Sequence, residues 1–210
     1  MPHLIDRMLS QKLKKMLNIP TLYLTYRAIV GGRKATSIFV RDYVRPKCRD
    51  RILDIGCGPA ETVEHFSNVE YVGFDNNPAY IELAKKNFGD QGHFFCGKID
   101  QVSLKDFEAF DLVLAVGVLH HLDDNESISL FKLAYEVLKD GGRLVTYDGC
   151  YVEGQSKIAQ FIISQDRGRF IRKKDDYLNL ARQVFKNVKQ DLRDDLLRIP
   201  YTHLIMECNK

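Results

Sequence analysis

Short apolar runs alternate with helical patterns through the middle of the chain. Each apolar run ends at a glycine or a polar residue, and each helical stretch repeats apolar residues at steps of three and four. This alternation is typical of a parallel sheet that helices cover on both faces. The predicted strands are residues 51–55, 71–74, 94–96, 110–116 and 144–147, and the helices between them are predicted at 60–66, 78–88 and 125–138.

The two ends of the chain follow other patterns. Residues 3–48 have helical periodicity with breaks at Pro20 and Gly31-Gly32, and we expect an N-terminal helical cap over residues 1–48. A basic amphipathic helix for a membrane surface is the alternative, although this stretch lacks Trp. Beyond residue 148 the pattern predicts helices at 156–164 and 175–185 and two final strands at 188–197 and 202–208.

The composition is that of an ordinary globular chain. Of the 210 residues, 45% are hydrophobic and 28% are charged, which excludes a disordered or fibrous protein. The net charge of +3 is too balanced to predict nucleic acid or an anionic membrane as the main partner. The chain has no run of 18 apolar residues, so we expect no membrane span. Its odd number of cysteines, with no C-x-x-C pair, favours a reducing cytoplasm.

The strongest candidate for chemistry is the turn after the first predicted strand. Asp54 is followed closely by Gly56-Cys57-Gly58, where glycine allows positive φ and lets a ligand lie against the backbone. The segment departs from the dinucleotide fingerprint G-x-G-x-x-G because Glu61 stands at the sixth position. Asp54 and Glu61 make the turn acidic, so it suits a ligand with a positive centre better than one with phosphates.

An acidic residue ends the second predicted strand. Asp75 follows Gly56 at the spacing where a carboxylate can accept two hydrogen bonds from a ribose diol. Taken alone, an acid at a strand end more often caps the chain than binds a ligand. Together with the glycine turn, Asp75 predicts a ribose site.

Four motifs in this order resemble the class I S-adenosylmethionine-dependent methyltransferases, and most of all their small-molecule branch of methyltransferase types 11 and 12. The motifs are Asp54 to Gly58, Asp75, Val116 to Leu122 and Leu138 to Leu144. The resemblance covers residues 50–148 well and the tail to 208 in outline. It implies a Rossmann-like, doubly wound α/β fold with a seven-stranded, mostly parallel sheet and an antiparallel last strand. It also implies a domain over residues 49–210, with a helical substrate cover inserted at about 150–185.

The resemblance assigns residues to the cofactor, S-adenosylmethionine. Asp75 would bind the ribose hydroxyls, and Asn76 would lie against the adenine. Asp100 would meet the adenine amine, with a backbone contact at Ile99 as the alternative. The residues implied at the methionine end and the sulfonium are Asp54, Gly56, Cys57, Gly58, Val116 and Gly117.

Two histidines follow the fourth predicted strand, where this fold places the reacting substrate. His120 or His121 could take a hydroxyl proton while the methyl group transfers, and His120 is the preferred catalytic candidate. The alternative is that one or both histidines only bridge backbone loops. Asp123-Asp124 could add metal ligands, but these acids more simply start the next helix, so we expect no metal.

A basic segment lies between the fifth predicted strand and the final pair, where this fold commonly builds a substrate cover. It spans residues 166–174, and we expect Arg167, Arg169 and Arg172 to bind a carboxylate or phosphate of the acceptor. A solvated loop is the second interpretation. An RNA-binding patch is the third, and for that role Phe170 is the one stacking aromatic in the segment.

The function that follows is methyl transfer from S-adenosylmethionine to an oxygen of a small anionic metabolite or sugar, ahead of transfer to nitrogen or carbon. An RNA or protein methyltransferase and a non-catalytic binding protein on the same fold are the alternatives. The intact set of Asp54, Gly56, Gly58 and Asp75 argues against a lost cofactor site. We expect a cytoplasmic monomer or homodimer with a small-molecule partner.

Overall fold

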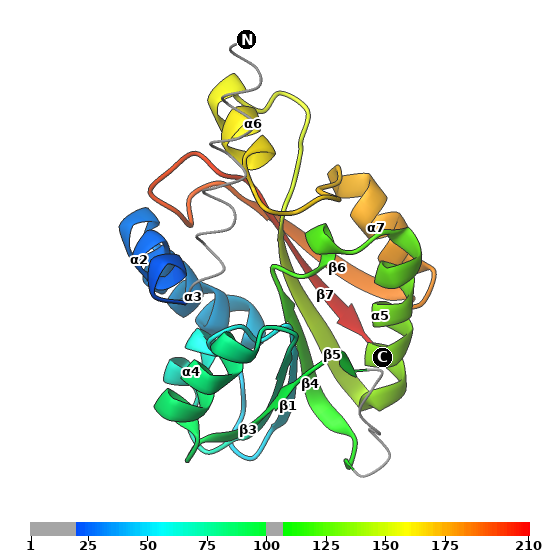
Figure 1. Cartoon of the computed structure of the whole chain (residues 1–210). Helices are drawn as coiled ribbons and strands as arrows, with labels where there is room; N and C mark the ends of the chain where they lie inside the picture. Colours follow the sequence, from blue (N-terminus) through cyan, green and yellow to red (C-terminus); the bar gives the residue numbers. More distant parts are fainter. Residues whose placement is uncertain (1–19, 100–106) are drawn as a thin grey trace.

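One sheet runs through the molecule and positions the other elements. The computed structural model describes residues 20–99 and 107–210. Within these ranges the strand order is β3-β2-β1-β4-β5-β7-β6 (Figure 1). Strand β7 runs antiparallel to both neighbours, and the other strands run parallel to one another. The strands are β1 (Arg51–Ile55), β2 (Glu70–Asp75), β3 (Gly92–Cys96), β4 (Phe110–Val116), β5 (Leu138–Gly149), β6 (Asn187–Arg193) and β7 (His203–Asn209).

The central strands are apolar because both of their faces are covered. In β1, Ile52 and Leu53 are fully buried, and in β4 the same holds for Val113 and Leu114. Apolar runs of this kind are what parallel strands between two helical layers require. The predicted fold class, a doubly wound α/β sheet with an antiparallel last strand, is confirmed.

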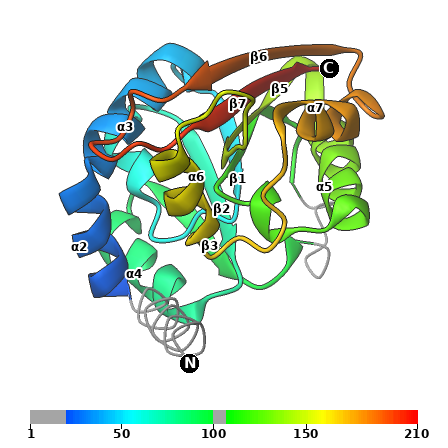
Figure 2. The ribbon, with the colours of Figure 1, turned by 90° about the horizontal axis from the view of Figure 1, so that it is seen from above.

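Helices cover both faces of the sheet (Figure 1). The helices are α2 (Pro20–Val30), α3 (Gly32–Phe39) with the π-helical turn η1 (Val40–Val44), α4 (Pro78–Phe88), α5 (Asp124–Val137), α6 (Lys157–Ser164) and α7 (Lys174–Arg182). On one face, α3 and α4 bury a cluster that includes Phe39 and Ile81. On the other face, α5 and α7 bury a cluster that includes Phe131 and Tyr177. Helices α2 and α6 lie at the edge of the sheet where the parallel strands end (Figure 2).

The first crossover differs from the prediction of a helix at 60–66. Residues Glu61–His65 form one short 3₁₀ segment, η2, and Phe66 already has extended backbone. Ala60 has a φ of +59°, which turns the chain out of the helical path. The β-branched Thr62 and Val63 also disfavour a longer helix. The predicted helical stretch is therefore present as a short 3₁₀ helix and not as an α-helix.

Strand β5 is longer than the predicted 144–147. It begins at Leu138, directly after α5, and its pairing with β4 shifts register before Arg143. At its other end β5 continues past Tyr147, which pairs with the last residue of β4. This extension brings Asp148 to the sheet edge at which the glycine turn also lies.

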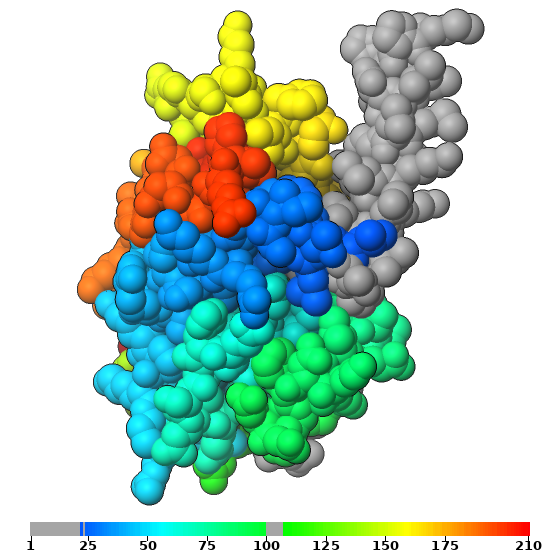
Figure 3. Space-filling model, turned by 90° about the vertical axis from the view of Figure 1, so that its left-hand side faces the viewer, coloured from blue at the N-terminus to red at the C-terminus, as the bar shows by residue number. Residues whose placement is uncertain are grey.

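Helix α2 lies at the surface, between the segment that contains α6 and the segments around α4 (Figure 3). The connection between β6 and β7 holds its carboxyl end, because the Arg198 N–H donates to the Val30 carbonyl at 2.8 Å. The first 19 residues of the predicted cap lie outside the described residues, and the division into a cap and a 49–210 domain stays a prediction. In the described part of the chain, no helix has the length and apolar character needed to cross a membrane.

Candidate active site

A cavity of about 560 Å³ opens at the carboxyl ends of β1, β4 and β5 and the start of β7. Helices α2 and α3 form one wall, and α6 with the loop after it forms the other. Open α/β sheets bind their ligands at this edge, where the strand order reverses. The predicted site residues that line the cavity are Asp54, Gly56, Cys57, Gly58, Val116, Gly117, His120, His121 and Arg167.

The glycine turn after β1 needs its glycines. Gly56 has a φ of +73°, and a Cβ there would lie 2.6 Å from the Val118 Cγ2. Gly58 has a φ of +55°, and a Cβ there would meet nothing within 4 Å, so its backbone faces open space. The Gly56 and Cys57 N–H groups donate to the Phe74 carbonyl at 2.8 and 2.9 Å, which ties the turn to β2. The cavity therefore has a tight backbone wall that a ligand can approach closely.

Asp54 lies at the base of this turn and is 1% exposed. Its Oδ2 accepts hydrogen bonds from the Tyr71 hydroxyl at 2.7 Å and the Thr62 hydroxyl at 3.3 Å. No group among the described residues donates to its Oδ1. Burial raises the pKa of Asp54 to about 7. The free oxygen of this carboxyl group is therefore ready to accept a hydrogen bond from a cationic or N–H ligand.

Asp75 supports the turn from β2. Its Oδ2 accepts the Gly58 N–H at 2.9 Å, and its Oδ1 accepts the Asn77 N–H at 2.7 Å. Burial raises its pKa. Asp75 and the exposed Asn76 lie outside the cavity lining, and Asp100 lies outside the described residues. The roles assigned to these three residues around the adenosine stay predictions.

His120 follows β4 and is buried beside two carboxylates. Its Nδ1 lies 2.8 Å from the Asp148 Oδ1, and its Nε2 lies 3.6 Å from the Asp166 Oδ1. Its backbone N–H also donates to Asp148, at 3.2 Å. Burial acts to lower the pKa of His120, but the hydrogen bond and charge of Asp148, with the charge of Asp166, outweigh it and raise the pKa. A histidine oriented by a carboxylate in this way can act as a general base.

His121 lines the cavity next to His120, with 4.2 Å between the ring centroids. Desolvation of its ring by the surrounding protein, together with the charge of His120, lowers the pKa of His121 to about 4. The two histidines therefore differ. The pKa of His121 is shifted downward, whereas that of His120 is shifted upward.

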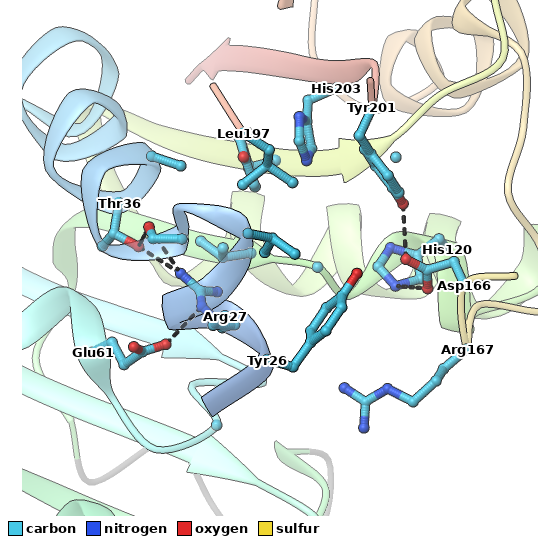
Figure 4. A pocket seen from close by; sticks show the side chains of 18 of the residues that line it. Tyr26, Arg27, Thr36, Glu61, His120, Asp166, Arg167, Leu197, Tyr201 and His203 are labelled. Carbon is cyan, nitrogen blue, oxygen red and sulfur yellow. Dashed lines mark hydrogen bonds and ion pairs between the residues drawn. The ribbon is translucent and has the colours of Figure 1, made fainter. Parts of the chain in front are cut away.

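Asp166, Tyr201 and His203 extend the polar side of the cavity beyond His120 (Figure 4). The Tyr201 hydroxyl donates to the Asp166 Oδ2 at 2.8 Å, and the rings of Tyr201 and His203 lie 4.6 Å apart. Burial acts to raise the pKa of Asp166, but the charge of His120 and the hydrogen bond from the Gly168 N–H hold it below its usual value. A continuous polar row thus runs from His120 to His203.

Of the three predicted acceptor-binding arginines, Arg167 is the one that lines the cavity. Its positive charge acts to lower the pKa of both His120 and Asp75, so the guanidinium lies within electrostatic reach of the histidine and of the glycine turn. Arg169 is exposed and lies outside the lining. The fold therefore does not bring the arginines together at one point.

Arg172 has a different role from the one predicted. It is 9% exposed, and its Nε and Nη2 donate to the Asp124 Oδ1 at 2.9 and 2.8 Å. Its Nη1 and Nη2 also donate to the carbonyls of Leu119 and Leu122 at 3.0 and 2.7 Å. All three guanidinium nitrogens are thus engaged within the protein, and Arg172 holds the turn around His120 instead of lining the acceptor cavity.

The wall opposite the histidines carries an ion pair. The Arg27 Nε in α2 lies 2.8 Å from the Glu61 Oε2, and the Arg27 Nη2 donates to the Thr36 hydroxyl at 2.6 Å (Figure 4). This pair connects α2 and α3 to the segment after the glycine turn. Apart from these groups the wall is mostly apolar, with Leu22 and Ile29 from α2.

The sequence pattern did not indicate four members of the site: Asp148, Asp166, Tyr201 and His203. Asp148 could have been found by the signal that identified Asp75, an acid at the end of a predicted strand. Tyr201 and His203 carry no comparable signal, because they precede or begin an antiparallel strand whose place beside β5 becomes visible only in the fold.

Within residues 20–99 and 107–210, no three His, Cys, Asp or Glu side chains are grouped so that they could hold a metal ion. The fold and cavity define a Rossmann-like α/β protein with a ligand site over β1, β4 and β5. Residues 53–146 match the family model described as a methyltransferase domain.

Relatives and solved structures agree with this class. The chain is 28% identical over 170 residues to sterol 24-C-methyltransferase of Saccharomyces cerevisiae, covering 72% of this chain and 43% of that one. It is 33% identical over 142 residues to ubiquinone biosynthesis O-methyltransferase of Bradyrhizobium sp., covering 64% and 53%. The fold resembles magnesium protoporphyrin IX methyltransferase of Synechocystis PCC 6803, solved with bound SAH, at a TM-score of 0.66 and 16% identity over 86% of this chain and 84% of that one.

Over residues 53–146 the chain is therefore similar to the methyltransferase domain that this family model describes, and its fold is the one that S-adenosylmethionine-dependent methyltransferases share. The chain spans about half or less of the length of the two curated relatives. S-adenosylmethionine is the methyl donor of the family, and the residues present fit it. The unpartnered Oδ1 of Asp54 suits the cofactor's ammonium group, and the open backbone at Gly58 leaves room beside it.

Proposed function

We propose that the protein transfers a methyl group from S-adenosylmethionine to an oxygen of a small anionic acceptor in this cavity. The observation that carries the proposal is the pairing of His120 with Asp148 at the end of β4, in the wall of the cavity that the glycine turn also lines. A hydroxyl group must lose its proton as it gains the methyl group, and this pair provides a base at that position.

The residues around β1 and β2 would bind the cofactor. When bound, S-adenosylmethionine supplies a methyl group on a positively charged sulfur. Asp54 would accept a hydrogen bond from the ammonium group, and the backbone of Val116 and Gly117 would face the methionine portion. Asp75 and Asn76 would contact the ribose and the adenine, and Asp100 the adenine amine. Cys57 would contribute backbone to the turn.

His120 would remove the acceptor's proton. The Asp148 carboxylate fixes the orientation of the ring through Nδ1, so Nε2 is the nitrogen left to face an acceptor hydroxyl. Asp166 beside Nε2 would stabilise the imidazolium that forms. His121, with its low pKa, would contribute to the shape of the wall and not to proton transfer.

The acceptor would lie between α2, α6 and the loop after α6. Arg167 lies in the cavity wall, and its guanidinium group has the geometry to pair with a carboxylate or phosphate of the acceptor. Leu22, Ile29 and Phe161 are exposed apolar side chains at the same cavity, so an acceptor with an apolar body would also be stabilised there. The names of two relatives, a sterol 24-C-methyltransferase and a ubiquinone biosynthesis O-methyltransferase, are compatible with an acceptor that has such a body.

Incubation with methyl-labelled S-adenosylmethionine and a panel of small hydroxy acids tests the proposal. The panel would contain mono- and dihydroxybenzoates, hydroxycinnamates and uronic acids, and mass spectrometry would detect the methylated product. We expect an O-methyl product that His120→Gln forms far more slowly. A product methylated on carbon or nitrogen, or salt-sensitive binding of RNA as the main activity, would contradict the proposal.

A further inference from the structure

His203 is a buried polar residue to which the proposed methyl transfer gives no role. It begins β7, is 5% exposed and lines the cavity. Its Nδ1 has no hydrogen-bond partner in the part of the chain that the structure describes. Buried polar atoms are normally paired, and an unpaired one is costly to retain. A ligand in the cavity would provide the missing partner.

The ring of His203 packs against two tyrosine rings. It stacks on Tyr147 with 4.4 Å between the centroids and 16° between the planes, and it contacts the tilted ring of Tyr201 at 4.6 Å and 34°. Its backbone pairs with Gly149 on β5 and Arg193 on β6. An imidazole packed in this way presents its nitrogens in fixed directions, which is a requirement for selective recognition.

The position of His203 in the sheet places it on the acceptor side. The cofactor would lie over β1 and β2, and β7 is separated from β1 by β4 and β5. A row of contacts runs from His203 through Tyr201 and Asp166 to His120, the proposed base. Figure 4 shows His203 and Tyr201 on the same side of the cavity, across from Arg27.

We propose that His203 recognises the acceptor by a hydrogen bond to a second oxygen, a hydroxyl or carbonyl group other than the oxygen that is methylated at His120. This inference rests on the proposed function and narrows the class of acceptor. A neutral imidazole offers one N–H donor and one nitrogen acceptor, and a hydroxyl group complements both.

The charge state of His203 agrees with a neutral partner. Burial lowers the pKa of His203 to about 3, and the charges of Arg27 and His120 act in the same direction against that of Asp166. The ring is therefore neutral throughout the physiological range. The anionic group of the acceptor would bind Arg167, and its uncharged second oxygen would bind His203.

The test measures Michaelis constants for the hydroxy acids of the panel that the wild-type protein methylates. His203→Phe keeps a ring between Tyr147 and Tyr201 but removes both nitrogens. We expect it to raise the KM of acids with a second hydroxyl or carbonyl group by about tenfold, because one hydrogen bond is lost. Acids without that group should be unaffected. His203→Asn, which can place an amide near the position of Nδ1, should recover part of the affinity.

Two further readouts separate recognition from packing. The affinity for S-adenosylhomocysteine, measured by calorimetry, and the melting temperature should not fall in His203→Phe. The matched control is His93→Phe, which changes an exposed histidine on β3 and should leave every KM unchanged.

Each outcome either supports or overturns the proposed role of His203. An unchanged KM in His203→Phe overturns this inference while the proposed function stands. A fall in melting temperature together with an equal KM rise for all acids assigns His203 to packing and also overturns it. Absence of wild-type turnover across the panel overturns the proposed function and this inference with it.

Discussion

At the scale of single residues, the buried carboxyl group of Asp54 has opposite effects on folding and on binding. Its ionised form lowers the stability of the fold but favours a cationic ligand. Burial raises its pKa from 3.8 to about 7, so the folded protein keeps a proton there that the unfolded chain has released. Stability must therefore fall as the pH rises through that window, because the unfolded state binds fewer protons than the folded state. A bound cation would favour the ionised carboxylate and offset this cost.

The variant Asp54→Asn separates the two effects. It removes the charge and keeps an oxygen for the Tyr71 hydroxyl. At pH 8 we expect a gain of roughly 2 kcal/mol in stability, or about 4–8 °C in melting temperature, with at least about tenfold weaker binding of S-adenosylmethionine. The stability gain should shrink as the pH falls toward 4. Scanning calorimetry across this range checks the prediction, and a lower melting temperature at pH 8 would contradict it.

His120 should give the reaction its pH dependence. Its pKa is raised, and only the neutral ring can accept a proton, so kcat/KM should rise with pH and level off above that pKa. His120→Gln should lower kcat by about 10²-fold and remove this dependence, with affinity for S-adenosylhomocysteine unchanged. The exposed His93 on β3 provides the control His93→Gln. If His120→Gln kept the wild-type pH profile, another group would be the base.

At the scale of elements, the loop between α6 and α7 positions the turn that carries His120. The Phe170 N–H donates to the His120 carbonyl at 2.9 Å, and Arg172 binds the carbonyls on either side of the histidines. Gly168 packs directly on the His120 ring, with no space for a side chain. The loop thus acts on the reaction through the orientation of His120.

Gly168→Ala tests this contact. A Cβ at this position would overlap the His120 ring and lie 2.8 Å from the His120 carbonyl oxygen, so the loop or the ring must move. We expect kcat to fall by about tenfold or more while cofactor affinity is retained, because misplacement of a base is costly in rate. Steady-state kinetics with calorimetry measures both. Gly154→Ala has open space around its Cβ but a φ of +73°, so it serves as a control for backbone strain alone.

Arg172→Lys tests the anchor of the same loop. A lysine cannot reproduce a guanidinium that donates to Asp124 and to the Leu119 and Leu122 carbonyls at once. We expect a loss of roughly 1–3 kcal/mol in unfolding free energy, measured by urea denaturation. Arg169→Lys, at an exposed position, should change stability by less than about 0.5 kcal/mol. An Arg172→Lys protein of unchanged stability would show that the anchor is dispensable.

At the scale of the whole molecule, the sheet was predictable because its strands are apolar on both faces. Runs such as residues 51–55 and 110–116 end at glycines, and their predicted bounds agree with β1 and β4. The glycine turn was predictable for the same reason, since positive φ restricts the choice of residue. The segment 60–66, which was predicted as helical, forms only a short 3₁₀ helix, and its composition does not reveal the positive φ of Ala60.

The acceptor end was harder to predict because distant segments assemble it. Asp148 comes from β5, Asp166 from the loop after α6, Tyr201 from the segment before β7, and His203 from the first position of β7. Each is one polar residue without a periodic pattern around it. The three arginines, which did form a sequence pattern, are separated by the fold, since Arg172 turns inward to Asp124 while Arg167 lines the cavity.

The most direct test of the account follows the methyl group itself. S-adenosylmethionine labelled with ¹³C in its methyl group would be incubated with the hydroxy acid panel, and NMR would locate the label in the product. We expect the label to be bonded to oxygen, and we expect His120→Gln to slow its transfer while still binding S-adenosylhomocysteine. A wild-type protein that fails to bind S-adenosylhomocysteine, or that delivers the label to carbon or nitrogen, would contradict the account.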